Sequence, residues 1–216
     1  MNIFSINSVF RGLARVLPVK FCKNKRNMSN LIQGTASDEL KRIVWVDLEM
    51  TGLDIEKDHI LEVACLVTDG KLDIIAEGPN LILHQPVDVL NNMNAWCLDH
   101  HGKTGLIQES LKSKLSLPET EKILLDFVEK HVGKGVCPLA GNSVYIDRLF
   151  LRKYLPNFND YLHYRIIDVS TIKELCRRWY PMEFSEQPKK KLVHRAMSDI
   201  KESINELKYF RQSIFK

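Results

Sequence analysis

Two carboxylates lie at alternate positions near the end of an apolar, β-branched run, in the sequence Val46-Asp47-Leu48-Glu49. Such a run predicts a strand, and because side chains alternate across a strand, Asp47 and Glu49 project from the same face. Adjacent carboxylates beside apolar surface repel each other, and a bound cation relieves that repulsion. Mg²⁺ suits the pair because it binds one or two carboxylates and leaves room for substrate phosphates. An edge strand with a solvated face would show the same alternation, so this stretch alone leaves both interpretations open.

Two further carboxylates stand at unusual places on predicted helices. Asp147 precedes Phe150, Leu151 and Tyr154 by three, four and seven residues, which puts it on the apolar face of its helix. Asp199 falls at the edge of the apolar stripe of the last helix. Carboxylates that bridge two divalent cations can activate a water and stabilise the leaving oxygen of a phosphoryl displacement. The four acids therefore indicate a two-metal site for phosphoryl chemistry.

His194 is the candidate general base of such a site. It precedes Asp199 by five residues, and five residues rotate an α-helix by about 140°, so the two cannot share a helical face. We therefore expect His194 on the loop that enters the last helix, folded over the acids. A histidine titrates near neutral pH and can take a proton from a water molecule.

Charge is divided unevenly along the 216 residues, although the net charge is +4. Residues 1–37 hold six basic and no acidic residues, which leaves 25 basic against 27 acidic residues in 38–216. A protein that follows long nucleic acid is usually basic, so this body should hold only a short piece. The five cysteines are widely spaced, without a C-x-x-C, and indicate buried thiols in a reducing compartment. No apolar run approaches the length of a membrane span, so we expect no membrane association.

The basic extension 1–37 alternates arginines with apolar residues, which predicts an amphipathic mitochondrial presequence. A basic disordered tail is the alternative. Initiation at Met28 would remove most of the extension and yield a cytoplasmic or nuclear form. Residues 38–216 form the predicted catalytic domain.

The order of predicted elements is typical of a mixed α/β fold. An Asp69-Gly70 turn joins the second and third strands, so three strands form an antiparallel meander that later strand–helix units extend in parallel. One sheet with helices on both faces follows. We expect strands at 43–49, 59–68, 72–76 with a continuation at 80–83, 136–140 and 164–169, and helices at 90–99, from 118 to the glycines at 133–135, up to about 155, from a capping box at Thr171-Glu174 to Pro181, and at 196–210.

The ordered acids and the histidine resemble the three exonuclease motifs of the DEDDh class. Residues 46–53 (Val-Asp-Leu-Glu-Met-Thr-Gly-Leu), Gly141-Asn142-Ser143-Val144 followed by Asp147, and His194 with Asp199 match these motifs in order. More narrowly, residues 76–79, 96–97, 163–170 and 173–179 resemble the oligoribonuclease family, including its animal mitochondrial form. The resemblance covers roughly residues 42–216.

This resemblance implies an RNase H-like five-stranded fold, a homodimer and 3′→5′ hydrolysis of very short RNA down to dinucleotides. Two Mg²⁺ ions, or Mn²⁺, would be held by four ligands and His194 would be the base; short DNA is a further possible substrate. The implied ligands are Asp47, Glu49, Asp147 and Asp199. The implied substrate contacts are Leu53 and Trp96, which wedge the terminal bases; His101, Ser143, Arg165 and Ser170, which cap the 5′ phosphate; and Tyr164, donated by the partner subunit.

Each role has a simpler alternative. Trp96 on spacing alone could be a core residue, and Ser170 only a helix cap. For the acids Asp168 and Glu62 we expect a capping and a structural role, respectively. At the level of function, the alternatives are a DEDDh exonuclease that trims or proofreads longer strands, and an inactive nucleotide-binding module. The presence of all five catalytic-type residues argues against the module.

Overall fold

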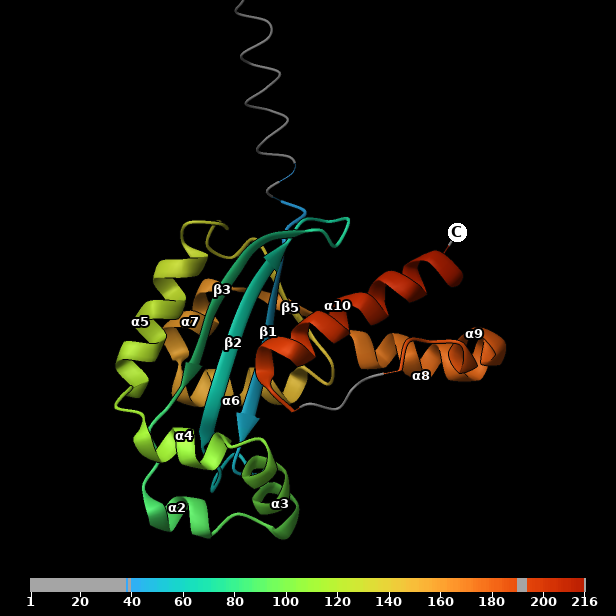
Figure 1. Ribbon diagram of the computed structural model, residues 1–216. Coiled ribbons are helices and arrows are strands. Elements are labelled where there is room, and N and C mark those ends of the chain that lie inside the picture. The colour runs from blue at the N-terminus through green and yellow to red at the C-terminus, as the bar shows by residue number, and fades with distance from the viewer. Residues whose placement is uncertain (1–37, 39, 190–193, 216) are drawn as a thin grey trace, which may run out of the picture.

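Five strands form one mixed sheet in the computed structural model, which describes residues 38, 40–189 and 194–215. The strand order is β3-β2-β1-β4-β5, so β1 lies at the centre (Figure 1). Antiparallel pairs join β1 to β2 and β2 to β3, whereas β1, β4 and β5 run parallel. The strands are β1 (Ile43–Met50), β2 (Ile60–Thr68), β3 (Ile74–Ile82), β4 (Pro138–Gly141) and β5 (His163–Asp168). The predicted meander with parallel extension is confirmed, while the extension 1–37 and its predicted targeting role lie outside the described residues.

The third strand differs from its prediction because β3 is continuous through Gly78 and Pro79. β3 is an edge strand, and an edge position tolerates a proline that has no N–H to donate. Gly78 is required there by close packing: a Cβ at this position would lie 2.6 Å from the carbonyl oxygen of Cys65 and from the ring of Phe127. Residues 77–79, which the prediction left out, therefore belong to the strand.

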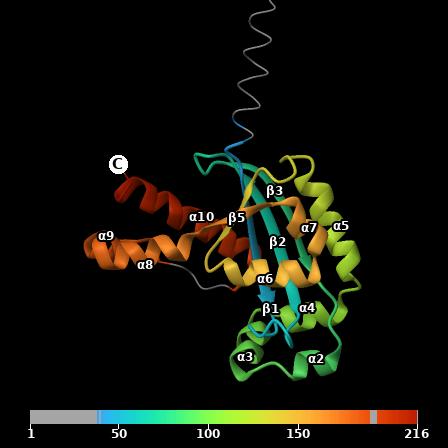
Figure 2. The same ribbon diagram turned by 180° about the vertical axis from the view of Figure 1, so that it is seen from behind.

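Helices cover both faces of the sheet, as Figures 1 and 2 show from opposite sides. On one face, α5, α6 and α7 pack over a core that includes Val44, Val46 and Leu48 of β1. On the other face, α10 packs over Ile43 and Trp45. These two residues lie on the same face of β1 as Asp47 and Glu49 and precede them along the strand. The helices are α2 (Val87–Asn91), α3 (Ala95–Lys103), α4 (Leu106–Lys112), α5 (Leu117–Val128), α6 (Tyr145–Tyr154), α7 (Pro156–Tyr161), α8 (Val169–Trp179), α9 (Pro181–Ser185) and α10 (Ala196–Ser213).

Helix boundaries differ from prediction where a local cap was overlooked. The helix expected at 90–99 is two helices, because Asn94 caps a new one by accepting a hydrogen bond from Cys97 N–H (2.9 Å). The capping box expected at Thr171-Glu174 is wrong, since α8 begins earlier with Asp168 as its N-cap. The capping role expected for Asp168 is thereby confirmed. α5 ends at Val128, before the glycines at 133–135.

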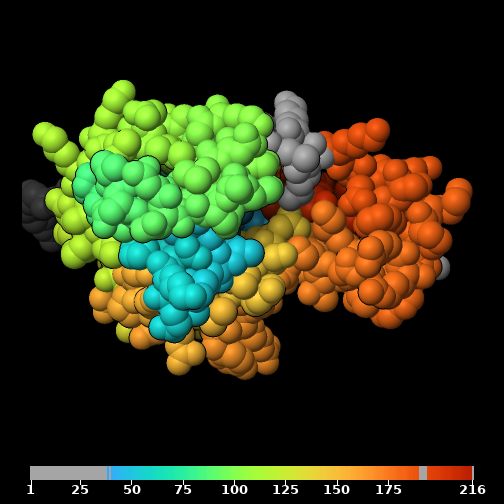
Figure 3. Space-filling view, turned by 90° about the horizontal axis from the view of Figure 1, so that it is seen from below, coloured from blue at the N-terminus to red at the C-terminus, as the bar shows by residue number. Residues whose placement is uncertain are grey.

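Helices α2, α3 and α4 form a small layer at the carboxyl end of β1, packed on their own cluster of buried residues that includes Leu61, Leu90 and Leu106. Seen from below (Figure 3), the turn that follows β1 lies between this layer and α6–α7. Helices α8 and α9 project to one side of the sheet together with the carboxyl end of α10. Within the described part of the chain, no helix combines the length and the apolar content that crossing a bilayer requires.

Candidate active site

The carboxyl end of β1 brings three acids together. Asp47 and Glu49 project from the face of β1 that packs on α10, and Asp199 lies in the first turn of that helix. One carboxylate oxygen from each of these residues lies within 4.8 Å of the others. The three acids therefore converge on a space in which one cation could be held by several oxygen ligands.

Glu49 lies in an environment that is unfavourable for a charge. Its side chain is 12% exposed. Burial raises the pKa of Glu49 from 4.5 to about 8, with smaller contributions from the negative charges of Asp199, Glu62 and Asp147, while Arg195 opposes the shift. A divalent cation would remove this penalty, so the donor set suits a metal that prefers oxygen ligands.

Asp147 lies next to this cluster, although it is not one of the three converging acids. It is 7% exposed in the first turn of α6, and its Oδ1 accepts a hydrogen bond from Leu48 N–H (2.9 Å). The pairing of β1 with β4 ends before Leu48, so the carboxylate of Asp147, and not a neighbouring strand, accepts the hydrogen bond from Leu48 N–H. Burial raises the pKa of Asp147 to about 7, and the hydrogen bond from Leu48 partly offsets that rise. Asp147 is thus fixed to the backbone between Asp47 and Glu49.

A pocket of about 400 Å³ adjoins the acids. Leu53 and Trp96 line it, and 69% and 54% of these residues' surface is exposed. Trp96 is therefore not a core residue. The turn that carries Leu53 requires Gly52, because a Cβ there would lie 2.4 Å from Asp58 Oδ2. The pocket is lined by Leu48, Glu49, Met50, Gly52, Leu53, Asn94, Trp96, Cys97 and His101.

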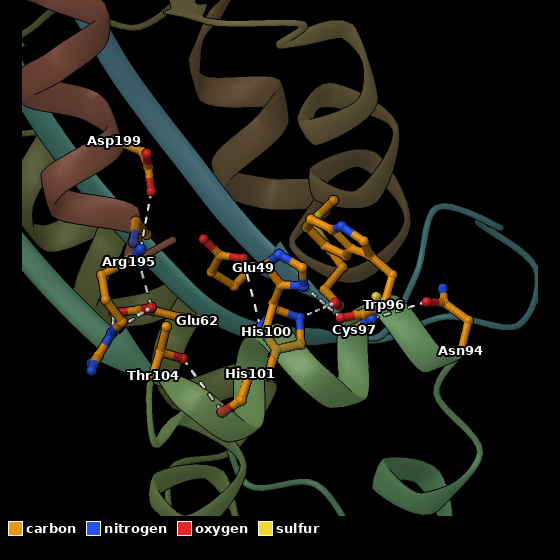
Figure 4. A network of polar contacts seen from close by, with 12 residues as sticks. Glu49, Glu62, Asn94, Trp96, Cys97, His100, His101, Thr104, Arg195 and Asp199 are labelled. Carbon is orange, nitrogen blue, oxygen red and sulfur yellow. Dashed lines mark hydrogen bonds and ion pairs between the residues drawn. The ribbon is translucent and has the colours of Figure 1, made fainter. Parts of the chain in front are cut away.

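Three aromatic rings meet beside the acids. The ring of His100 stacks on Trp96 with centroids 3.9 Å apart, and the ring of His194 meets both of them edge-on, at 5.1 Å from His100 and 5.5 Å from Trp96. His100 Nδ1 is also 2.8 Å from the carbonyl oxygen of Trp96, a contact drawn in Figure 4. His194 precedes α10, as expected, and has a φ of 51°, in the left-handed region. The histidine therefore lies beside the pocket that Trp96 lines.

His101 lies on the same helix but is buried beneath the pocket. Its ring is 1% exposed, with Nε2 2.9 Å from the carbonyl oxygen of Met50 and Nδ1 3.9 Å from Glu49 Oε2. Burial lowers the pKa of His101, which favours the neutral ring. Nε2 then donates to Met50, while Nδ1 has no hydrogen-bond partner among the described residues. The structure thus places His101 beside Glu49, on a different element from the serines with which the resemblance groups it.

The two serines of the predicted phosphate cap meet at the start of α8. Ser143, whose φ is 52°, lies with its hydroxyl 3.1 Å from that of Ser170. The N–H groups of both serines donate to Asp168 Oδ1, each at 2.9 Å. Ser170 also donates from its hydroxyl to Asn142 Oδ1 (3.1 Å). The structure therefore brings Ser143 and Ser170 together.

Tyr164 and Arg165 lie on the exposed edge strand β5. Tyr164 is 75% exposed, and the guanidinium of Arg165 lies 5.6 Å from the centre of its ring. The ring of His163 also stacks on Tyr164, with ring centroids 4.4 Å apart. Both predicted residues thus point to solvent and are available to a ligand or to a second chain.

Sequence reasoning overlooked Arg195, which is central to the polar network in Figure 4. Its guanidinium pairs with Glu62 and Glu109, and its backbone N–H donates to Asp199 Oδ2 (3.0 Å). The structural role expected for Glu62 is confirmed by this pairing. The sequence showed a single acid, Glu62, within the apolar β2 and a basic residue, Arg195, before the last helix. No local pattern indicated that these two residues pair.

Comparison with known proteins finds relatives over most of the chain. The family described as Exonuclease matches residues 44–207. The chain is 59% identical to the probable oligoribonuclease of Dictyostelium discoideum, over 83% of this chain and 94% of that protein. It is 58% identical to the mitochondrial oligoribonuclease of Bos taurus, over 82% of this chain and 74% of that protein.

Among solved structures, an exonuclease I from Methylocaldum szegediense aligns with a TM-score of 0.60 and 20% identity over 81% of this chain. The chain spans 41% of that exonuclease I, so this likeness concerns the fold alone. The same holds for Escherichia coli exonuclease I in complex with an oligonucleotide, with a TM-score of 0.60, 15% identity and coverage of 80% of this chain and 40% of that one.

Proposed function

The chain belongs to the oligoribonuclease family of 3′→5′ exoribonucleases, and from this premise we propose how its residues hydrolyse very short RNA, down to dinucleotides, to mononucleotides. The observation that carries the proposal is the convergence of Asp47, Glu49 and Asp199 beside the pocket of Leu53 and Trp96. This arrangement would place a scissile phosphate next to the acids while the terminal base lies in the pocket.

The metal is proposed to be Mg²⁺, with Mn²⁺ as a substitute. The oxygen ligands and the raised pKa of Glu49 fit a hard divalent cation, and Asp147 would complete the set of acids around two ions. When bound, such ions activate the attacking water and stabilise the leaving oxygen of an in-line displacement. Asp147 contributes by holding the backbone of Leu48, and thereby the spacing between Asp47 and Glu49.

His194 is proposed to move the proton. A ring nitrogen of the neutral imidazole would accept the proton of the attacking water, a role that needs a group titrating near neutral pH. Its contacts with the rings of Trp96 and His100 support this role, because they hold the imidazole at the pocket that would contain the substrate.

Leu53 and Trp96 are proposed to hold the terminal bases between them. Base stacking on an aromatic ring tolerates any sequence, which suits an enzyme of general RNA degradation. His100 supports the arrangement because it covers one face of Trp96 and leaves the indole oriented before substrate arrives. Preorganisation of this kind reduces the entropy lost on binding.

The 5′ phosphate of the substrate is proposed to meet the hydroxyls of Ser143 and Ser170. Asp168 accepts hydrogen bonds from the N–H groups of both serines and so holds them in place. The hydroxyls contact each other, and that of Ser170 donates to Asn142, so binding of the phosphate would require them to exchange these contacts for the phosphate oxygens, beside the guanidinium of Arg165. His101 would take part only as an imidazolium, whose Nδ1–H could donate to the phosphate, because Nδ1 of the neutral ring that donates through Nε2 to Met50 is an acceptor. A pocket closed in this way would select short RNA without a long basic surface.

A homodimer is proposed to complete the site, with Tyr164 reaching into the partner. Exposed aromatic and apolar side chains on β5, α8 and α9 support it, since such surfaces mark interfaces. Tyr164, Trp179 and Met182 are exposed by 75%, 65% and 72%. Sedimentation equilibrium should give twice the chain mass, and a monomer at micromolar concentration would refute this part.

The cellular site is proposed to be the mitochondrion, with residues 1–37 as the presequence. Relatives from Bos taurus and Homo sapiens bear the word mitochondrial in their names, which supports this assignment. A product initiated at Met28 is proposed to serve the cytoplasm or nucleus. Imaging of the full chain and of the Met28 product, each fused at its carboxyl end to a fluorescent protein, tests both statements.

Substrate length is the direct test of the function. We compare turnover of a 5′-phosphorylated RNA dinucleotide with that of a ten-mer of the same base, at equal Mg²⁺ and enzyme concentrations. The proposal predicts faster turnover of the dinucleotide. A clear preference for the ten-mer would favour trimming of longer strands, and no turnover of either would favour a nucleotide-binding module. A matched DNA dinucleotide shows whether short DNA is also a substrate.

A further inference from the structure

A buried carboxylate lies beside Glu49 of the proposed metal site. Glu62 is fully buried in β2, and the antiparallel register sets it opposite Glu49. A buried charge requires a partner of opposite sign and further hydrogen bonds. Arg195 supplies the charge, with Nε 3.2 and 3.3 Å from the two carboxylate oxygens of Glu62, and Ala196 N–H donates to Oε2 at 3.4 Å.

The same arginine is held from a second side. Its two terminal nitrogens donate to the carboxylate of Glu109 on α4, at 2.9 and 3.4 Å. A guanidinium presents several donors in a rigid plane, so it can bind two carboxylates at once where a lysine cannot. Arg195 therefore ties the start of α10 to both β2 and α4, and Figure 4 shows it between Glu62 and Asp199.

We call Arg195 with its two carboxylate partners, Glu62 and Glu109, the clamp. The backbone of Arg195 connects the clamp to the proposed ligand Asp199 and the proposed base His194. Its N–H donates to Asp199 Oδ2 (3.0 Å), which orients one of the three converging acids. The residue just before it is His194, with φ of 51°. A non-glycine residue stays in the left-handed region only where its surroundings hold it there. A fixed Arg195 provides such a restraint on one side, and the Trp96–His100 stack provides one on the other.

We propose that Arg195, anchored by Glu62 and Glu109, is a positioning residue that holds His194 and Asp199 in register over the acids on β1. The proposal rests on the proposed function, in which His194 is the base and Asp199 a ligand. The clamp acts through geometry. It links the helix that supplies Asp199, the strand beside Glu49 and the helical layer that carries Trp96.

The experiment compares clamp variants with matched controls in the full chain. Glu62→Gln removes the buried partner, and Arg195→Lys keeps the charge while losing the second carboxylate contact. Glu77→Gln breaks a different ion pair between α10 and the sheet, that with Lys201 (2.8 Å). Ile204→Val, at a buried position of α10, should lower the stability of the fold modestly and does not change a clamp residue, so it controls for an effect of stability alone. Steady-state kinetics on the RNA dinucleotide with Mg²⁺, and NMR of proteins with labelled histidine and tryptophan, are measured on wild type and on all four variants.

We expect Glu62→Gln and Arg195→Lys to lower kcat by about 10- to 100-fold, the scale of a catalytic group displaced by about 1 Å, while KM changes by less than about threefold. The nuclear Overhauser effects between the rings of His194 and Trp96 should weaken in both clamp variants and persist in both controls. A kcat within twofold of the controls in both clamp variants, with unchanged Overhauser effects, would overturn the proposal.

If Glu62→Gln does not fold, Arg195→Lys and Glu109→Gln decide the outcome, because Glu109 is 43% exposed and its loss leaves the buried pair intact. The two proposals fail in different ways. A wild-type chain that does not hydrolyse the dinucleotide overturns the proposed function, and the Overhauser effects still decide the clamp. A wild-type chain that is active together with clamp variants that match the controls overturns the clamp alone.

Discussion

Glu49 should make the metal-free protein less stable as pH rises, which is the reverse of the usual behaviour of a carboxylate. Its pKa of about 8 in the folded chain lies above the ordinary value of 4.5 that it regains on unfolding. Between these values the folded state holds a proton that the unfolded state releases. The contribution of Glu49 to stability is therefore complete below about pH 4.5 and is lost as pH rises towards 8.

The size of this effect follows from the shift. One pKa unit corresponds to 1.36 kcal/mol, so the free energy of unfolding should fall by about 3 kcal/mol between pH 5 and pH 8 through Glu49 alone. His101 contributes in the opposite direction, since burial lowers its pKa and its charged form is the one lost on folding. Glu49→Gln removes the titration of Glu49 and leaves in place both His101 and Asp147, whose pKa is also raised. The difference between wild type and variant therefore isolates Glu49.

Urea unfolding followed by circular dichroism, in EDTA at pH 5 and at pH 8, measures this difference. The free energy of unfolding of the variant minus that of wild type should be larger at pH 8 than at pH 5, by about 3 kcal/mol. Added Mg²⁺ should stabilise wild type more at pH 8 than at pH 5, because the ligands must lose their protons to bind a cation. A wild-type chain whose stability relative to Glu49→Gln does not change with pH would refute the reasoning about this buried acid.

Three other perturbations test the proposed roles. His194→Ala should lower kcat on the RNA dinucleotide by roughly 10²–10⁴-fold, the usual loss for a general base, and a variant as fast as wild type across neutral pH would place the base elsewhere. Trp96→Ala should raise KM by about tenfold or more, because stacking contributes about 1–3 kcal/mol per base, whereas Trp96→Phe should recover part of the loss; equal KM values would contradict the stacking role. Asp147→Asn should keep an acceptor for Leu48 N–H, retain the fold by circular dichroism and lose more than about 10²-fold in kcat. Activity retained by Asp147→Asn would show that its charge is not needed.

Periodicity predicted on which faces of their elements the acids lie. Asp47 and Glu49 share a strand face because the period of a strand is two, and Asp147 lies on the buried face of α6 as its spacing from Phe150 requires. His194 lies before α10, as the rotation of a helix over five residues predicted. These inferences succeeded because each rests on the geometry of a single element.

Contacts between distant elements were not predictable in this way. The pairing of Arg195 with Glu62 and Glu109 joins residues more than 80 positions apart, and no local pattern encodes the choice of partner. The stacking of His100 on Trp96 depends on the exact start of α3, which is set by the side chain of Asn94. The continuity of β3 depends on its position at the edge of the sheet, where Pro79 is tolerated.

The central claim is that the acids at the end of β1 hold the metal ions with which this chain hydrolyses short RNA. Turnover of the 5′-phosphorylated RNA dinucleotide by wild type and by Asp47→Asn, each with Mg²⁺ and with EDTA, tests it most directly. Wild type should release mononucleotides only with Mg²⁺, and Asp47→Asn should be inactive while its circular dichroism spectrum matches that of wild type. Hydrolysis by Asp47→Asn at the wild-type rate with Mg²⁺ would contradict the claim.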